Sequence, residues 1–132
     1  MTDLIIRVAT SPESGRGHLT RCLNIRKFIN ISVTWYTDFT DKYIISLIPK
    51  RDKIYQEKNK NSCDLLQKNN LKKNNILLID SYHISYKKKE ELMSNFKVVS
   101  IEDKKTDLKV NIVICPQPLV DSKKNIYNLI GL

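Results

Sequence analysis

Short apolar runs recur along the chain and predict strands. The clearest run, 76–80, holds four consecutive apolar residues before Asp80, which is typical of a strand buried on both faces of a sheet. At 31–36, apolar and polar residues alternate, and this period of two predicts a further strand. The complete set of expected strands is 4–10, 31–36, 50–55, 76–80, 97–101 and 110–115.

Apolar side chains at helical spacing predict helices between these strands. From residue 18 to residue 29, the side chains of Leu19, Cys22 and Ile29 fall on one face, as in an amphipathic helix. Apolar strands that alternate with helices indicate an α/β fold, in which helices cover both faces of a mostly parallel sheet. The other expected helices are 41–48, 63–70 and 87–96.

The length and composition allow one domain of this kind. The chain has 132 residues, of which 41% are hydrophobic, which is enough for one core but too little for two ordinary domains. The sequence has no membrane-length apolar run and no signal-peptide pattern. Its three cysteines lie far apart, without metal-ligand or redox spacing. We therefore expect a cytoplasmic protein with reduced cysteines and no membrane partner.

The chain is basic, with a formal net charge of +9, and such a charge favours anionic partners. The lysine-rich stretches 50–60 and 68–73 contain few aromatic residues, whereas a surface that stacks nucleic-acid bases needs them. A solvated surface explains these lysines better, so binding of nucleic acid is not expected. A basic binding module without catalytic activity stays open as an alternative.

Three polar segments follow predicted strands, at 14–18, 80–83 and 102–103. In open α/β sheets, ligands bind beyond the carboxyl ends of the strands. We therefore expect these segments to converge at one edge of the sheet and to form the binding site.

The first segment, Ser-Gly-Arg-Gly-His, opens a predicted helix. Gly15 and Gly17 allow positive φ and the close approach of a ligand, and the helix N-terminus that follows Arg16 suits an anion. The same field disfavours an imidazolium at His18, and a neutral imidazole can take a proton from water as a general base. Glycines are also common in turns and histidine is common at helix starts, so the segment alone leaves a capping role open.

The other two segments supply carboxylates and an aromatic ring. Asp80 can orient His18 or a substrate hydroxyl, or it can cap a helix. Tyr82 can anchor a sugar by hydrogen bonding or stacking, or it can cover the edge of the core. Glu102 and Asp103 can face the site, or they can form a solvated turn.

Several common catalytic sites do not fit this sequence. Its two histidines cannot form a credible zinc constellation. The P-loop motif and the Gly-x-Ser-x-Gly nucleophile elbow are both absent. No metal and no cofactor are therefore expected.

Several motifs together resemble one family of nucleotide-sugar enzymes. Ile-Arg-Val at 6–8, Gly-Arg-Gly-His at 15–18 and Arg-Cys-Leu at 21–23 are similar to the opening of the UDP-2,4-diacetamido-2,4,6-trideoxy-β-L-altropyranose hydrolases of pseudaminic acid biosynthesis. The Gly-x-Gly-His element is shared more loosely by GT-B glycosyltransferases, including the MurG-like group. The later segments that resemble the hydrolases are 78–82, 98–103 and 111–115.

The resemblance implies the Rossmann-like N-terminal domain of a GT-B-type fold, in a hydrolase that needs no metal. Such an enzyme releases UDP and a free 2,4-diacetamido-2,4,6-trideoxy hexose. His18 is then the base that activates water at the anomeric carbon, and Asp80 and Tyr82 line the sugar side. The complete set of expected substrate-binding residues is Gly15, Arg16, Gly17, Asp80, Tyr82 and Asp103.

Two departures from the family pattern change these expectations. Ala9 stands where the family usually has an acidic residue. The family also has a second α/β domain with most of the UDP contacts, so we expect one domain at 1–120 and the start of a crossing segment to a missing C-terminal UDP-binding domain at 121–132. The chain alone is then expected to hydrolyse a UDP-sugar weakly or not at all, and a separate UDP-binding domain or chain would be its partner. Half of a GT-B glycosyltransferase, in which the base activates an acceptor hydroxyl, stays open as an alternative.

Overall fold

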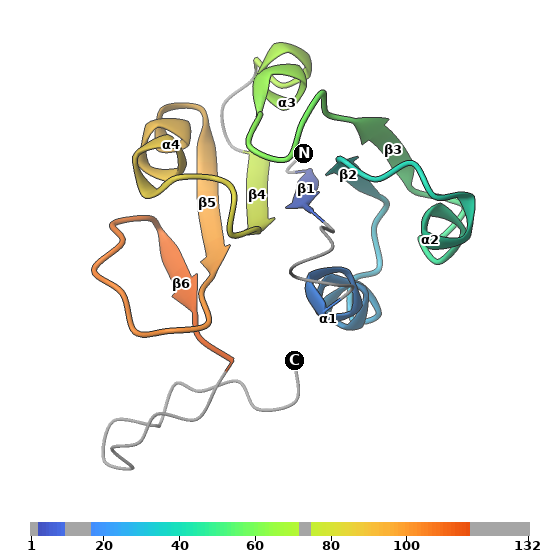
Figure 1. Ribbon diagram of the computed structural model, residues 1–132, viewed down its shortest axis with the longest axis horizontal. Helices are drawn as coiled ribbons and strands as arrows, with labels where there is room; N and C mark the ends of the chain where they lie inside the picture. The colour runs from blue at the N-terminus through green and yellow to red at the C-terminus, as the bar shows by residue number, and fades with distance from the viewer. Residues whose placement is uncertain (1–2, 10–16, 72–74, 117–132) are drawn as a thin grey trace.

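A six-stranded sheet forms the centre of the computed structural model, which describes residues 3–9, 17–71 and 75–116 (Figure 1). Its strands are β1 (Leu4–Val8), β2 (Val33–Thr37), β3 (Lys53–Gln56), β4 (Asn75–Asp80), β5 (Phe96–Ile101) and β6 (Ile112–Ile114). They are ordered β3-β2-β1-β4-β5-β6, and every neighbouring pair is parallel. This is the strand order of the Rossmann fold, so the predicted α/β, Rossmann-like class is confirmed.

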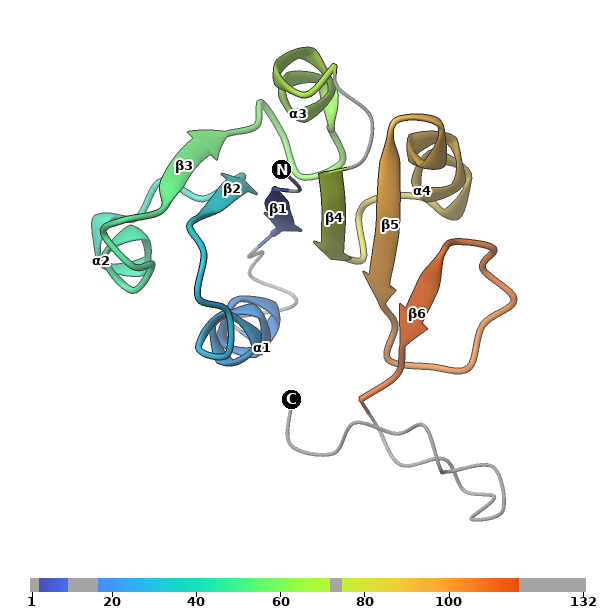
Figure 2. The ribbon, with the colours of Figure 1, turned by 180° about the vertical axis from the view of Figure 1, so that it is seen from behind.

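Helices cover both faces of this sheet, as Figure 2 shows from behind. The helices are α1 (Gly17–Arg26), α2 (Lys42–Ser46), α3 (Asp64–Asn69) and α4 (Tyr86–Glu91), and a 3-10 turn, η1 (Leu92–Ser94), follows α4. In Figure 1, α1 and α2 lie on one side of the sheet and α3 and α4 on the other. Within the described residues, no helix has the length and apolar character needed to cross a membrane.

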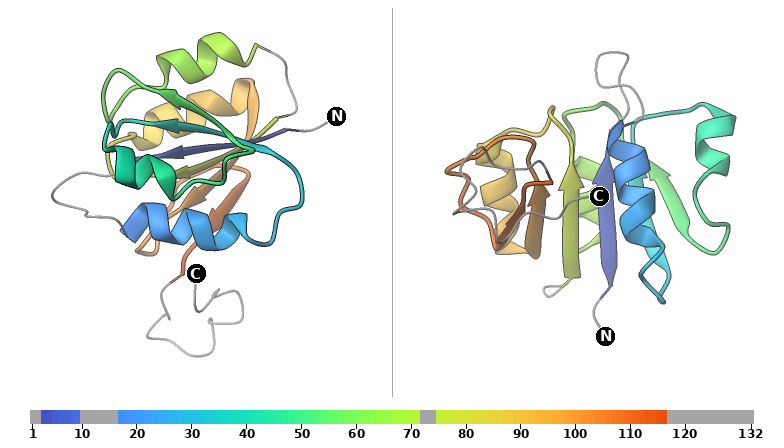
Figure 3. Two further views of the ribbon diagram at one scale, coloured as in Figure 1. Left: turned by 90° about the vertical axis from the view of Figure 1, so that its right-hand side faces the viewer. Right: turned by 90° about the horizontal axis from the view of Figure 1, so that it is seen from below.

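Side chains that alternate along the strands divide the core into two layers. In β1, Ile5 joins a cluster that contains Leu66 of α3, whereas Ile6 joins a second cluster that contains Leu19 of α1. Figure 3 shows the sheet between its two layers of helices. Because successive side chains of a strand point to opposite faces, the same alternation decides which helix layer each strand-end residue meets.

The structure differs from the sequence-based expectation mainly at the ends of the elements. The expected helix 87–96 is wrong at its end, because α4 stops at Glu91 and Phe96 already belongs to β5. Leu92 and Phe96 are four residues apart, which imitates helical spacing, but both are buried in one core cluster from a 3-10 turn and a strand. The expected strand 110–115 is shortened to Ile112–Ile114.

A buried ion pair joins the C-terminal end of α1 to the sheet. The guanidinium of Arg26 donates from Nε and Nη2 to the two carboxylate oxygens of Asp52, at 2.7 and 2.8 Å. Asp52 also accepts hydrogen bonds from Trp35 Nε1 and from the backbone N–H of Val33, the first residue of β2. Burial alone would raise the pKa of Asp52, but these hydrogen bonds outweigh burial and lower it.

Replacing Asp52 with alanine is expected to lower the free energy of unfolding by about 3–5 kcal/mol, because Arg26 would stay buried without a counter-charge. Urea denaturation followed by far-UV circular dichroism measures this loss. Asp107→Ala removes an exposed carboxylate and serves as the control, with an expected change within about 0.5 kcal/mol.

The same pair predicts a pH dependence. Since the folded-state pKa of Asp52 is lowered, its stabilising contribution is complete above the unfolded-state pKa of about 3.9 and is lost as the pH falls through the lowered value. The difference between wild type and Asp52→Ala should therefore shrink below about pH 4. A difference of constant size down to about pH 2 would contradict this assignment.

Candidate active site

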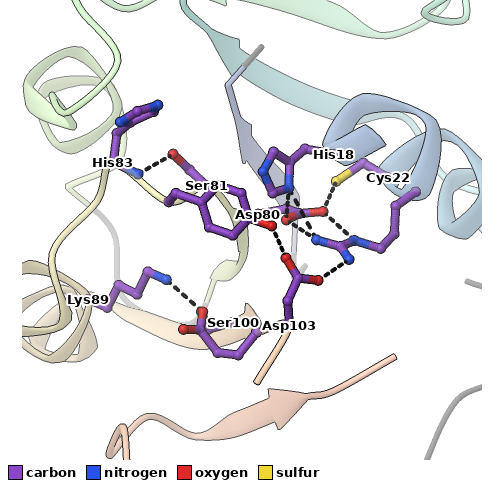
Figure 4. A network of polar contacts seen from close by, with 11 residues as sticks. His18, Cys22, Asp80, Ser81, His83, Lys89, Ser100 and Asp103 are labelled. Atoms are coloured by element: carbon purple, nitrogen blue, oxygen red, sulfur yellow. Dashed lines mark hydrogen bonds and ion pairs between the residues drawn. The ribbon is translucent and has the colours of Figure 1, made fainter. Parts of the chain in front are cut away.

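The candidate site lies where the course of the chain changes direction in the sheet. β1 and β4 are neighbours, but the chain leaves β1 toward α1 on one face and leaves β4 toward α4 on the other. In open α/β sheets, ligands bind beside the carboxyl ends of the strands at such a switch point. His18 lies in the first turn of α1, Asp80 ends β4, and Asp103 follows β5, so all three lie at this edge (Figure 4).

His18 and Asp80 form a buried pair. His18 Nδ1 lies 2.5 Å from Asp80 Oδ1, and the two residues are 4% and 0% exposed. Because two lone pairs would repel at this distance, Nδ1 carries the proton and donates it to the carboxylate. In the neutral ring, Nε2 is then the proton acceptor. Nε2 is buried and has no hydrogen-bond partner among the described residues.

Arg21 joins both carboxylates of the site and was not in the expected set of site residues. Its Nε and Nη2 donate to Asp80 Oδ2 and Oδ1 at 2.8 and 2.6 Å, and its Nη1 donates to Asp103 Oδ1 at 2.7 Å. Burial would lower the pKa of Arg21, but hydrogen bonds to Asp80 and Asp103 outweigh it and raise the pKa. One signal pointed to it: Arg21 is three residues after His18 in a predicted helix, a spacing that puts both side chains on one face.

Tyr82 lies edge-on against His18. The two ring centroids are 4.4 Å apart with an interplanar angle of 76°. The Tyr82 hydroxyl donates a hydrogen bond to Asp103 Oδ2, and this bond is the main reason why the pKa of Tyr82 is raised to about 12. The Tyr82 residue is nevertheless 64% exposed, so its ring lies at the surface while its partner His18 is buried.

Glu102 and Asp103 separate, although they are adjacent in sequence. Asp103 meets Arg21 and Tyr82, whereas Glu102 accepts a hydrogen bond from Lys89 Nζ at 2.8 Å on the α4 side. The alternation of side chains along β5 explains why the two carboxylates point to opposite faces. Ile101 packs in the layer of α1, and Asp103, two residues later, points to the same face. Asp80 likewise shares the parity of Leu78, which also packs in the α1 layer.

The remaining expected residues lie elsewhere or outside the described residues. Gly15, Arg16 and the segment 121–132 are not among the described residues. Gly17 is the first residue of α1, and a Cβ added there would meet no atom within 4 Å, so space beside it is open. The ring of His83 points away from the pair of His18 and Asp80 (Figure 4).

The chemistry of the site is that of a base held by a carboxylate. Within the described residues, no group of three or more His, Cys, Asp and Glu side chains is arranged to hold a metal ion. The guanidinium of Arg21 lies between Asp80 and Asp103, where it neutralises part of their charge. Cys22 is a poor nucleophile here, because burial and then the nearby Asp80 charge raise the pKa of its thiol well above the usual value.

The comparisons with known proteins add no family to this description. No protein-family model matches the chain, and a search of curated proteins finds no match. The fold and the geometry therefore define a class only: a Rossmann-like α/β domain with a histidine–aspartate pair at its switch point.

The link between Tyr82 and Asp103 gives a testable prediction. Burial would raise the pKa of Asp103, but hydrogen bonds from Tyr82 and Arg21 outweigh burial and lower it. Tyr82→Phe removes one of these donors, so the pKa of Asp103 should rise, as measured by carboxyl ¹³C NMR. Tyr55→Phe changes a tyrosine of β3 and should leave the Asp103 titration unaltered. An unchanged pKa in Tyr82→Phe would show that the hydroxyl does not hold this carboxylate in solution.

Proposed function

We propose that this chain is the N-terminal half of a nucleotide-sugar hydrolase, which releases UDP from a 2,4-diacetamido-2,4,6-trideoxy hexose of pseudaminic acid biosynthesis. One observation carries the proposal. The hydrogen bond between His18 Nδ1 and Asp80 leaves Nε2 as a proton acceptor at the switch point of a Rossmann-like sheet, with no hydrogen-bond partner in the described part of the chain. The motif resemblance at 15–18, 21–23 and 78–82 supplies the substrate class.

The proposed reaction is hydrolysis at the anomeric carbon. A water molecule attacks C1 while its proton passes to Nε2 of His18, and the bond from C1 to the diphosphate oxygen breaks with its electron pair leaving on UDP. The carboxylate of Asp80 stabilises the imidazolium that forms. A diphosphate is already a fair leaving group, so positioning and one base account for much of the acceleration.

Tyr82 and Asp103 belong to the sugar side in this proposal. Asp103 is an acceptor, and the N–H groups of two acetamido substituents and the hydroxyls of a sugar are donors that suit it. Tyr82 offers an exposed ring that can pack against a sugar face. Both residues border His18 directly or through Arg21, and this supports a proposed sugar position beside the base.

The diphosphate needs other partners. Arg21 is the cation of the described site, and its donors are already directed at Asp80 and Asp103. We therefore propose that UDP is held by a second α/β domain, in the same protein or in a separate chain, and that the chain alone is a weak catalyst or an inactive one. A substrate of this kind places the reaction in the cytoplasm, where nucleotide sugars are made.

The experiment is an assay of UDP release from the UDP-linked diacetamido sugar, with the chain alone and with a companion UDP-binding domain encoded beside it. Wild type is compared with His18→Ala, and His83→Ala is the matched control because it changes the other histidine. His18→Ala should lose at least about 100-fold in rate, the usual range for a general base, and His83→Ala should retain the wild-type rate. In ¹⁸O-labelled water, the label should enter the free sugar and not UDP.

Three results would contradict the proposal. Equal rates for wild type and His18→Ala would remove His18 from the mechanism. Label in UDP would show attack at phosphorus instead of C1. Release of UDP that occurs only when an acceptor sugar is added would assign the site to a glycosyltransferase.

A further inference from the structure

Arg21 contacts His18 and both carboxylates of the site. It lies one turn after His18 on α1, and its side chain is only 13% exposed. Its guanidinium donates two parallel hydrogen bonds to Asp80 and a third hydrogen bond to Asp103. A fork of this kind fixes the plane of a carboxylate as well as its position, which a lysine ammonium cannot do.

The orientation of the Asp80 carboxylate determines which ring nitrogen of His18 carries the proton. Asp80 Oδ1 accepts from both Arg21 Nη2 and His18 Nδ1, at 2.6 and 2.5 Å. Arg21 Nη2 also lies 3.1 Å from His18 Nδ1, so these atoms form one compact group. If the carboxylate turned, Nδ1 would lose its acceptor, and Arg21 or solvent could then donate to Nδ1 instead. The proton of the neutral ring would move to Nε2, which would no longer be a base.

We propose that Arg21 is a positioning residue for His18. It holds the Asp80 carboxylate in the plane that keeps the proton on Nδ1 and leaves Nε2 free to accept one. The source of the proton that Nε2 accepts rests on the proposed function. The effect of Arg21 on the tautomer of the imidazole is independent of that function.

Two kinds of measurement test this inference, in Arg21→Met and Arg21→Lys. The first is ¹⁵N NMR of the histidine rings at a pH where they are neutral. The chain has two histidines, so His18→Ala identifies the His18 signals. Wild type should show Nδ1 protonated and Nε2 bare. Arg21→Met should shift the ring toward the Nε2–H form, which free imidazole side chains favour, and Arg21→Lys should fall between the two.

The second measurement is steady-state hydrolysis by the same variants in the assay described above. Because Arg21 acts through Asp80, Arg21→Met should lower kcat by about 100-fold, the scale of a lost general base, with little change in KM. Arg21→Lys should recover part of kcat. Arg51→Met is the matched control, since Arg51 is exposed and its described contact is a single long bond to the Ile29 carbonyl. Its NMR spectrum and its rate should be those of wild type.

The outcomes separate this inference from the proposed function. A wild-type tautomer in folded Arg21→Met overturns the inference, and so does a raised KM with unchanged kcat, which would mean that Arg21 binds substrate. If Arg21→Met does not fold, a wild-type tautomer and wild-type kcat in Arg21→Lys overturn it equally. A shifted tautomer in a protein that hydrolyses no UDP-sugar even with the companion UDP-binding domain would support the positioning role and reject the proposed function.

Discussion

The carboxylate of Asp80 ends the central strand β4 and is fully buried. A buried carboxylate is tolerated when donors fill its lone pairs, and its burial is costly when a partner is removed. Here the donors are Arg21, His18 and the thiol of Cys22, all from α1. The same contacts that allow a buried charge at the end of this central strand therefore dock α1 and set the direction of the imidazole, so stability and chemistry depend on one group.

Much of the fold was predictable because it rests on local patterns. Runs such as 76–80 and the alternation at 31–36 reflect strands covered on both faces, and the alternation of strands with helices predicted a mostly parallel sheet. The end of α4 was not predictable in this way. Leu92 and Phe96 have helical spacing, but the core draws them together from a turn and a strand, and only the three-dimensional neighbours decide between these arrangements.

The candidate site was predictable in outline and not in detail. The rule that strand ends converge pointed to His18, Asp80, Tyr82 and Asp103, and the structure brings these four together. Arg21 escaped prediction because its importance comes from two carboxylates, Asp80 and Asp103, that lie far from it in the sequence. The net charge of +9 did not help to predict the residues of the site. Many of the lysines are exposed, and the described site contains two carboxylates for one guanidinium.

Helix α1 is anchored by two arginine–aspartate pairs, one at its middle and one at its last residue. Arg21, the fifth residue of the helix, pairs with Asp80, and Arg26, the last residue, pairs with Asp52. A helix of ten residues is about 15 Å long, and it cannot tilt or slide without separating a buried ion pair. α1 is therefore fixed in position against the sheet. When a molecule binds, exposed groups such as the ring of Tyr82 adjust, while the imidazole of His18 stays in place.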